Sequence, residues 1–326
     1  MKTDTNIPSS EYSEHSESAA TENAESSAHS EPGNSTFHIP HSTLTFLGTG
    51  TSTGVPQIGC QCPVCTSNDP RDRRLRASAL VSIAHTDGHD TNLLIDCGPD
   101  FRQQILRAGA PALDALLVTH SHYDHVGGID DLRPYCNIAA LRHGHTGPFP
   151  VYCSEDVARD LRARVPYCFA EHLYPGVPTY DIHIIEPYKE LHIDGIRILP
   201  VTVMHARLPI LGFRIYLPDS DNGDNAGTPT HGGTRDIGYI TDCKTLPQQS
   251  IDAMRGVDTL VINALRHTPH MSHITLDEAL ALIRDIAPRR AYLTHLSHDM
   301  GTHADTAATL PQGVAIATDT LSITLP

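Results

Sequence analysis

The sequence predicts an α/β domain, because short apolar runs alternate along the chain with turns and with helix-like segments. With 326 residues, 39% of them hydrophobic, the chain can form one large domain with a substantial core. Helix-like segments lie at 101–108, 246–254 and 276–286. The runs typical of strands occupy 44–47, 79–84, 92–95, 115–119, 196–203, 212–217, 238–241, 259–263, 291–294 and 314–317.

Two segments are too polar for this domain. Residues 1–41 are rich in Ser, Glu, Ala, Asn and Thr, with Lys2 as their one lysine or arginine. Such a composition buries too little apolar surface to offset the entropy of ordering, so it predicts a disordered acidic tail before a domain at 42–326. The run at 219–236, made largely of Asp, Asn, Gly, Thr and Pro, predicts a flexible insertion between two strands.

The charge balance and the absence of long apolar runs exclude several classes of protein. Lysine and arginine number 23 against 38 acidic residues, a formal charge of -15, which argues against a generally basic surface for nucleic acid. No apolar stretch approaches the ~20 residues that cross a bilayer, and the N-terminus lacks a hydrophobic segment. We therefore expect a cytoplasmic protein that binds neither membranes nor nucleic acid.

The most informative motif follows the apolar run 116–119 and contains His120, His122, Asp124 and His125. Alternation along an extended chain places the first two histidines on one side, and the Gly-Gly turn after the motif can bring Asp124 and His125 back toward them. Imidazole and carboxylate suit zinc, manganese or iron, and four such groups exceed what one catalytic ion needs. The motif predicts two ions, and the alternative is a polar surface loop that happens to contain three histidines.

This His-x-His-x-Asp-His pattern resembles the signature of the metallo-β-lactamase superfamily, whose fold is an αββα sandwich with metal ligands on loops at one edge of two facing sheets. The resemblance extends over 42–326, because His205, Asp242 and His295 stand in the order of the family's later ligands. It implies that His120, His122 and His205 bind one ion, that Asp124, His125 and His295 bind the other, and that Asp242 bridges them. Taken singly, His205 or Asp242 could equally be an ordinary polar residue at the edge of the core.

Asp96, in the segment Leu-Ile-Asp-Cys-Gly, resembles the family's early aspartate. In that role its carboxylate accepts a hydrogen bond from the second ring nitrogen of a ligand histidine and so orients it. The alternative is an aspartate that ends a strand at a turn.

A second metal site is expected at three cysteines within six residues, Cys60, Cys62 and Cys65. Eight cysteines in so long a chain are too sparse for a disulfide scaffold, whereas three close thiolates suit a structural zinc that lacks one ligand. His298 is the expected fourth ligand, since it follows His295 by three residues in the same loop. Uncoordinated thiols are the alternative.

The cysteines, the Gly-Thr-Gly-Thr-Ser-Thr-Gly-Val-Pro loop at 48–56 before them and the His-Leu-Ser-His segment at 295–298 together resemble the phosphoribosyl cyclic phosphate phosphodiesterase subfamily of the bacterial carbon–phosphorus lyase pathway. Related coenzyme-biosynthesis proteins share the cysteines, with a first metal motif that is typically less complete. The glycine-rich loop is no nucleotide P-loop, because no Gly-Lys-Ser/Thr follows it.

The subfamily resemblance implies a homodimer with two Mn²⁺ or Zn²⁺ ions at a catalytic site and one structural Zn²⁺. It implies hydrolysis of small phosphodiesters, cyclic ribose or nucleotide phosphates, by a metal-bridging hydroxide. His273 matches a histidine that faces the substrate phosphate and, with Asp124, is assigned a catalytic role. A position in the capping region of the helix at 276–286 is the alternative for His273, and His270 is a weaker candidate for the role.

Three other functions remain open at this point. A tRNA-processing endonuclease uses the same seven ligands, although this chain shows no basic arm for RNA. A thioester or lactone hydrolase would direct the same nucleophile at a carbonyl carbon. A noncatalytic protein could retain the metals for stability or to bind a nucleotide.

Overall fold

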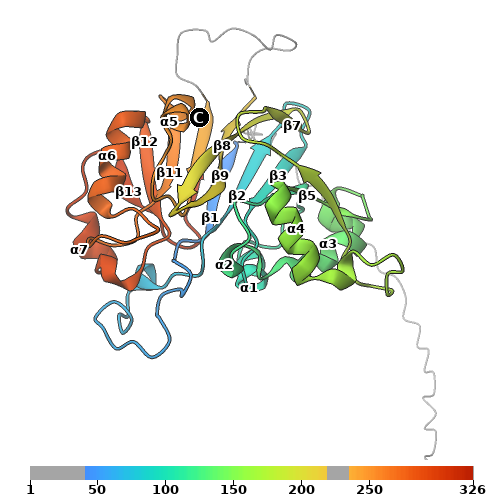
Figure 1. Cartoon of the computed structure of the whole chain (residues 1–326), viewed down its shortest axis with the longest axis horizontal. Coiled ribbons are helices and arrows are strands. Elements are labelled where there is room, and N and C mark those ends of the chain that lie inside the picture. Colours follow the sequence, from blue (N-terminus) through green and yellow to red (C-terminus); the bar gives the residue numbers. More distant parts are fainter. Residues whose placement is uncertain (1–40, 219–234, 326) are drawn as a thin grey trace, which may run out of the picture. The chain divides into compact units, whose positions relative to one another are not determined.

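The computed structural model describes residues 41–218 and 235–325, whose strands form two seven-stranded sheets (Figure 1). The first sheet is antiparallel across β14, β1, β2 and β3 and parallel from β3 to β6. In spatial order its strands are β14 (Ser322–Thr324), β1 (Thr43–Gly48), β2 (Ser78–Ala84), β3 (Asp90–Ile95), β4 (Ala115–Leu117), β5 (Phe149–Cys153) and β6 (Tyr180–Ile184).

The second sheet has the corresponding mixture of directions. It is parallel from β13 to β10 and antiparallel from β10 to β7. In spatial order its strands are β13 (Val314–Ile316), β12 (Arg290–Thr294), β11 (Thr259–Asn263), β10 (Asp236–Ile240), β9 (Leu208–Tyr216), β8 (Ile196–His205) and β7 (Leu191–Ile193).

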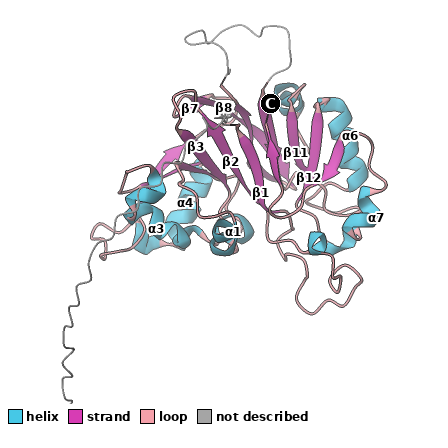
Figure 2. Cartoon of the chain, turned by 180° about the vertical axis from the view of Figure 1, so that it is seen from behind, coloured by secondary structure: helices cyan, strands magenta, loops and turns pink. Residues whose placement is uncertain are grey.

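Helices cover the outer face of each sheet, as the view from behind also shows (Figure 2). The first sheet carries α1 (Phe101–Arg107), α2 (Tyr123–Val126), α3 (Arg133–Asn137) and α4 (Glu155–Arg164). The second carries α5 (Gln248–Met254), α6 (Leu276–Ile286) and α7 (His303–Ala307). Short 3-10 helices occupy Pro70–Asp72, Ile129–Leu132, Ala139–Arg142, Pro166–Cys168 and His298–Met300.

Alternation along the strands produces three apolar layers. Leu93 and Ile95 of β3 lie in the core shared by the two sheets, whereas Leu94 packs on the outer side with α1 and α4. In the second sheet Val261 of β11 faces the shared core, and Leu260 packs on the outer side with α5 and α6. The layers are therefore helix, sheet, sheet, helix, which confirms the predicted αββα sandwich.

The predicted elements lie within four residues of the observed bounds, with α6 and β11 matching residue for residue and α1 ending one residue earlier. The strand expected at 115–119 is shorter, because only 115–117 pair in the sheet. The Val118 N–H still donates to the Tyr152 carbonyl of the neighbouring strand β5, whereas the Thr119 N–H donates to the Asp96 carboxylate. The strands β5, β6, β7 and β14 and the helices α2, α3, α4 and α7 were not predicted.

The predicted tail, except for its last residue, and residues 219–234 of the predicted insertion lie outside the described residues. The insertion was predicted to reach Asp236, but that residue begins β10 and is fully buried. Its carboxylate accepts a hydrogen bond of 2.7 Å from Arg214 Nε, so a buried ion pair holds it in the sheet. None of the described helices is long and apolar enough to span a bilayer.

Candidate metal centre and active site

The predicted ligands lie where strands of both sheets end. Asp96 follows β3, His205 is the last residue of β8, Asp242 lies two residues after β10, and His295 follows β12. Asp96, Asp242 and His295 have φ values of 60°, 53° and 54°, in the left-handed region that side chains other than glycine rarely occupy. Backbone strain of this kind is concentrated at functional sites, where it directs a side chain that an extended strand would turn away.

His120, His122 and His205 form the first group of candidate ligands, with one nitrogen of each within 4.8 Å of the others. His120 Nε2 lies 3.1 Å from His122 Nδ1. Two ligands of a tetrahedral zinc with bonds of about 2.0–2.1 Å lie about 3.3 Å apart, so this spacing is that of two imidazoles on one ion.

Hydrogen bonds fix which nitrogen of His205 faces the site. Its Nδ1 lies 2.9 Å from the backbone carbonyls of both Asp242 and Ser272, to which it donates. The carbonyls therefore hold the tautomer in which Nε2 keeps a free lone pair for a metal.

Asp124, His125, Asp242 and His295 form the second group, and all four are buried. His125 Nε2 lies 3.2 Å from Asp124 Oδ2 and 3.3 Å from Asp242 Oδ1, and His295 Nε2 lies 3.6 Å and 3.1 Å from the same two oxygens. All four distances are close to the separation of two ligand atoms bound to one tetrahedral ion.

Asp242 belongs to both groups. Its Oδ1 faces His125 and His295 of the second group, while its Oδ2 lies 3.7 Å from His120 Nε2 of the first. A carboxylate whose two oxygens face two ligand groups has the arrangement of a bridge between two cations. We call these seven residues the seven-ligand cluster: His120, His122, Asp124, His125, His205, Asp242 and His295.

The buried atoms of this cluster fit a cation. His125 Nε2 and both ring nitrogens of His295 are buried without any hydrogen-bond partner, a costly state that metal coordination removes. Burial would raise the pKa of Asp242, but His295 and His125 hold it well below its usual range. Burial and the neighbouring His125 lower the pKa of His120 well below its usual value. Burial would lower the pKa of His125, but Asp242 and Asp96 raise it well above its usual value, so a divalent metal would take the place of a proton beside these ionised carboxylates.

Asp96 contacts the cluster through His125. Its Oδ2 lies 2.7 Å from His125 Nδ1, and both side chains are fully buried. The backbone N–H and the hydroxyl of Thr119 also donate to the Asp96 carboxylate, and the same hydroxyl lies 3.0 Å from His120 Nδ1. Asp96 therefore orients His125 of the second group, and Thr119 orients His120 of the first.

Sequence analysis missed the parts played by Thr119 and by the Ser272 carbonyl. Thr119 could have been found, since it directly precedes the first histidine of the motif. The Ser272 carbonyl could not, because a backbone acceptor carries no signal in the sequence.

His273 lies beside the ligands, with its ring centroid 4.7 Å from that of His205 and 4.9 Å from that of His295. It is buried, its Nδ1 has no hydrogen-bond partner, and burial lowers its pKa to about 3. The cap of α6 is made by Thr275, whose hydroxyl and backbone N–H exchange hydrogen bonds with Glu278. Helix capping therefore does not account for the position of His273.

Cys60, Cys62, Cys65 and His298 form a separate group, the cysteine cluster, with ligand atoms within 4.8 Å of one another. The Cys60 and Cys62 sulfurs lie 3.2 Å and 3.4 Å from His298 Nδ1, close to the roughly 3.5 Å between sulfur and nitrogen ligands of a tetrahedral zinc. The Cys65 N–H and, more weakly, His298 lower the pKa of Cys62 to about 6, while burial raises that of Cys65 to about 11.

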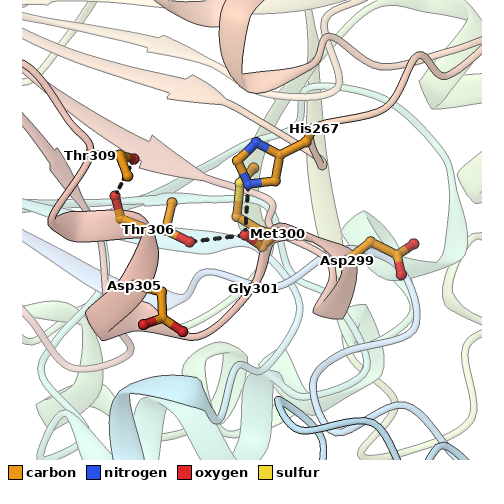
Figure 3. A pocket seen from close by; sticks show the side chains of 7 residues that line it. All are labelled: His267, Asp299, Met300, Gly301, Asp305, Thr306 and Thr309. Carbon is orange, nitrogen blue, oxygen red and sulfur yellow. Dashed lines mark hydrogen bonds between the residues drawn. The ribbon is translucent and has the colours of Figure 1, made fainter.

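A pocket lined in part by the 3-10 helix His298–Met300 shows what holds the loop of His298 (Figure 3). The Met300 carbonyl accepts hydrogen bonds from His267 Nε2 at 3.0 Å and from the Thr306 hydroxyl at 2.9 Å. These hydrogen bonds hold the loop of His298 in place. Its lining residues are His267, Asp299, Met300, Gly301, Asp305, Thr306 and Thr309.

Comparison with known proteins extends these observations. A family model described as a beta-lactamase superfamily domain matches residues 91–296. A crystal structure of a diphosphatase from the PhnP family is 36% identical, with a TM-score of 0.72, and the match covers 87% of this chain and 97% of that one. This likeness bears out the expected resemblance to a metallo-β-lactamase superfamily member near the PhnP family, and the activity given for that relative is a diphosphatase's.

Two further relatives differ more. An octanoyltransferase of Porphyromonas gingivalis is 38% identical over 267 residues, which are 82% of this chain and 48% of that protein, so the chain spans about half its length. The Zn²⁺-bound PqqB of Methylobacterium extorquens is 19% identical with a TM-score of 0.63, over 86% of this chain and 99% of that one, and supports the fold alone. The family match, the PhnP-family structure and the clustered ligands agree: this chain is a metal-dependent hydrolase and belongs to the metallo-β-lactamase superfamily.

Proposed function

We propose that this hydrolase is a dinuclear phosphodiesterase that cleaves small phosphodiesters, such as cyclic ribose or nucleotide phosphates. The observation that carries the proposal is the position of Asp242, whose two oxygens face two separate groups of candidate ligands. One ion would need no such shared carboxylate, whereas a two-metal site suits in-line displacement at phosphorus.

The cations, Mn²⁺ or Zn²⁺, would when bound supply a hydroxide nucleophile and neutralise charge on the phosphoryl oxygens. The protein's own part is orientation: Asp96 holds His125, and the Asp242 and Ser272 carbonyls hold His205. Ligands fixed in this way spend little energy on rearrangement during the reaction.

His273 is assigned to the substrate. Its Nδ1 is buried and unpartnered, and one of its ring nitrogens lies within 4.8 Å of ligand atoms of His205 and Asp242. A neutral imidazole N–H in this place can donate to a phosphoryl oxygen or to the leaving oxygen. The alternative for His273, as a further metal ligand, predicts that its loss lowers metal content as well as turnover.

The cations would be the main attraction for an anion, because two arginines near the site are engaged with protein groups, while Arg207, two residues after His205, is exposed. Arg266 donates to the Thr268 and Pro269 carbonyls and lies 3.7 Å from Asp299, and Arg164 donates to the Ser121 carbonyl. With these side chains engaged on a chain of formal charge -15, long nucleic acid would lack the phosphate contacts that it needs.

Exposed apolar side chains lie next to the ligands. Tyr123, between His122 and Asp124, is 59% exposed, and Met271, two residues before His273, is 83% exposed. Such groups favour a substrate with an organic substituent, as a phosphodiester has, over inorganic phosphate.

A second candidate function is hydrolysis at a carbonyl carbon, because one relative is named for transfer of an octanoyl group. Since the match covers about half of that protein, the octanoyl group is a candidate substrate moiety and no more.

The test compares turnover of bis-p-nitrophenyl phosphate, a ribose cyclic phosphate, a diphosphate ester, an acyl thioester and a precursor tRNA with Mn²⁺ or Zn²⁺. The variants are Asp242→Ala and His273→Ala, with His192→Ala, an exposed histidine of β7, as control. Metal-dependent cleavage of the small diesters, lost in Asp242→Ala and kept in His192→Ala, supports the proposal. Preference for the tRNA, the diphosphate or the thioester reassigns the substrate, and tight binding of a diester without turnover indicates a binding protein.

A further inference from the structure

A third group of imidazoles and carboxylates lies outside the two sites already described. His85 and His89 belong to the hairpin between β2 and β3, and Asp194 belongs to the turn between β7 and β8. One nitrogen of each histidine and one oxygen of Asp194 lie within 4.8 Å of one another. The two imidazole rings are stacked, with centroids 4.0 Å apart and an interplanar angle of 9°. We call these three residues the surface cluster.

We propose that the surface cluster binds one divalent transition metal, Zn²⁺, Cu²⁺ or Ni²⁺, independently of the catalytic and cysteine sites. Two imidazoles and one carboxylate are a recurrent ligand set for these ions, and a partly exposed position leaves room for water as the remaining ligands. The proposal does not depend on the function assigned to the seven-ligand cluster.

A neighbouring carboxylate prepares the main ligand. Asp87 Oδ1 lies 2.5 Å from His89 Nδ1, and the Nε2 of the same ring lies 2.9 Å from Asp194 Oδ2. His125 of the seven-ligand cluster is arranged in the same way. The Asp96 carboxylate faces its Nδ1, and its Nε2 is directed at the other ligands. A carboxylate on the far nitrogen fixes the ring and increases its basicity as a ligand.

His85 joins the site only if its ring turns, because its Nε2 donates to the Thr91 hydroxyl and its plane is stacked parallel to that of His89. Its Nε2 lies 2.7 Å from the Thr91 hydroxyl and 3.8 Å from Asp194 Oδ2. The Thr91 hydroxyl itself donates to Asp194. Metal binding would replace the contact between His85 and Thr91 and leave Asp194 oriented by the same threonine.

The surface cluster is remote from the seven-ligand cluster. Asp194 precedes β8, whose ten residues end at His205, so roughly 30 Å of strand separates the two residues. His89 likewise precedes β3, whose far end leads to Asp96. Because β2 and β3 belong to the first sheet and β7 and β8 to the second, a metal here would join hairpins of both sheets.

The experiment starts from the full chain with zinc filling the two other sites and excess metal removed by gel filtration. Calorimetric titration with Cu²⁺, Ni²⁺ or Zn²⁺ is expected to show one further binding event, weakened tenfold or more in His89→Ala and in Asp194→Asn. His143→Ala is the matched control, since His143 is a partly exposed histidine 3.5 Å from a single carboxylate, Asp114. A rise in Tm on metal addition should be lost in the same variants and kept in the control.

Two results would overturn the proposal. One is the absence of a further binding event up to millimolar metal in the wild-type protein. The other is an event that persists unchanged in both variants, which would place the added ion elsewhere. Asp194→Asn keeps the shape of the turn, so unfolding of the hairpin cannot explain a loss of binding in that variant.

Discussion

The seven-ligand cluster and the surface cluster use the same ligand types and differ in burial. His125 and His295 are fully buried, and three of their ring nitrogens have no hydrogen-bond partner. In the surface cluster both nitrogens of His89 face carboxylates. Burial thus makes a cation a requirement of the first cluster, whereas the second can exist as a hydrogen-bonded group that a cation enters.

The backbone shows the same contrast. Asp194 and Gly195 have φ values of 48° and 76°, which a two-residue hairpin turn requires, so the conformation of Asp194 follows from the turn. Asp242 and His295 have similar values at the ends of parallel strands, where no hairpin demands them. Their strain therefore has to be offset by the packing and the metal that hold them.

The largest expected effect comes from removing the shared carboxylate. Asp242→Ala should lower kcat/KM for the preferred substrate by about 10³-fold or more, because both cations lose a ligand and the positive site loses its central anion. Asp194→Ala should leave kcat/KM unchanged. Steady-state kinetics with metal analysis by mass spectrometry would check both, and an active Asp242→Ala with its full metal content would contradict the two-ion arrangement.

The next effect concerns the cysteine cluster, whose loop has little apolar support. Val55, Val64 and Cys65 form a satellite core of only three buried residues, so the order of this loop should depend on zinc. We expect Cys62→Ser to lose one zinc per chain and several kcal/mol of unfolding free energy, or to expose the loop to proteolysis.

The control for this prediction is Cys136→Ser, which changes a buried thiol outside the cluster. It should lower Tm without changing the zinc content. If Cys62→Ser kept its zinc and its protease resistance, the cluster would be a group of uncoordinated thiols.

Residues with a local signal in the sequence are the ones that the structure brings together. Four residues of the seven-ligand cluster lie within six positions directly after an apolar run, and the family resemblance gave the order of the other three, which lie where strands end. The helix α6 could be predicted because apolar residues recur with helical spacing after Thr275, whose capping box with Glu278 fixes its start.

Sequence reasoning failed where the signal is spread over distant residues. The surface cluster joins His89 to Asp194, 105 residues away, and no motif links a hairpin loop of one sheet to a turn of the other. The surface cluster depends on the packing of the two sheets. The strand β6 was missed although its five residues, Tyr180–Ile184, alternate between apolar and polar side chains as a half-buried strand should.

A smaller effect on metal binding should distinguish Asp96 from Asp87, the two carboxylates that orient ligand histidines. Asp96→Asn should weaken metal binding or activity about 10- to 100-fold, because the buried His125 loses the partner that fixes its ring. Asp87→Asn should weaken metal binding at the surface cluster less, since water can replace Asp87, which is 68% exposed as a side chain. Equal losses of metal affinity in the two variants would show that burial does not determine how much the orienting carboxylate contributes to metal binding.

The smallest effect is a pH dependence at His89. In the metal-free protein its hydrogen bond with Asp194, and then that with Asp87, raise the pKa of His89. The stabilisation is therefore fully present below the unfolded value of about 6.5 and is lost as the pH rises through the folded pKa. His89→Ala should destabilise the metal-free protein by less than about 1 kcal/mol, and more at pH 6 than at pH 9.

Saturating Cu²⁺ should reverse this slope, because a metal competes with the proton for His89 and binds more tightly as the pH rises. The difference in unfolding free energy between wild type and His89→Ala should then grow from pH 6 to pH 9. Urea denaturation with and without Cu²⁺ at the two pH values would measure both slopes, with His143→Ala as control. The same slope under both conditions would mean that the histidine serves only as an ion pair, and the surface cluster would then differ from the seven-ligand cluster in chemistry as well as in burial.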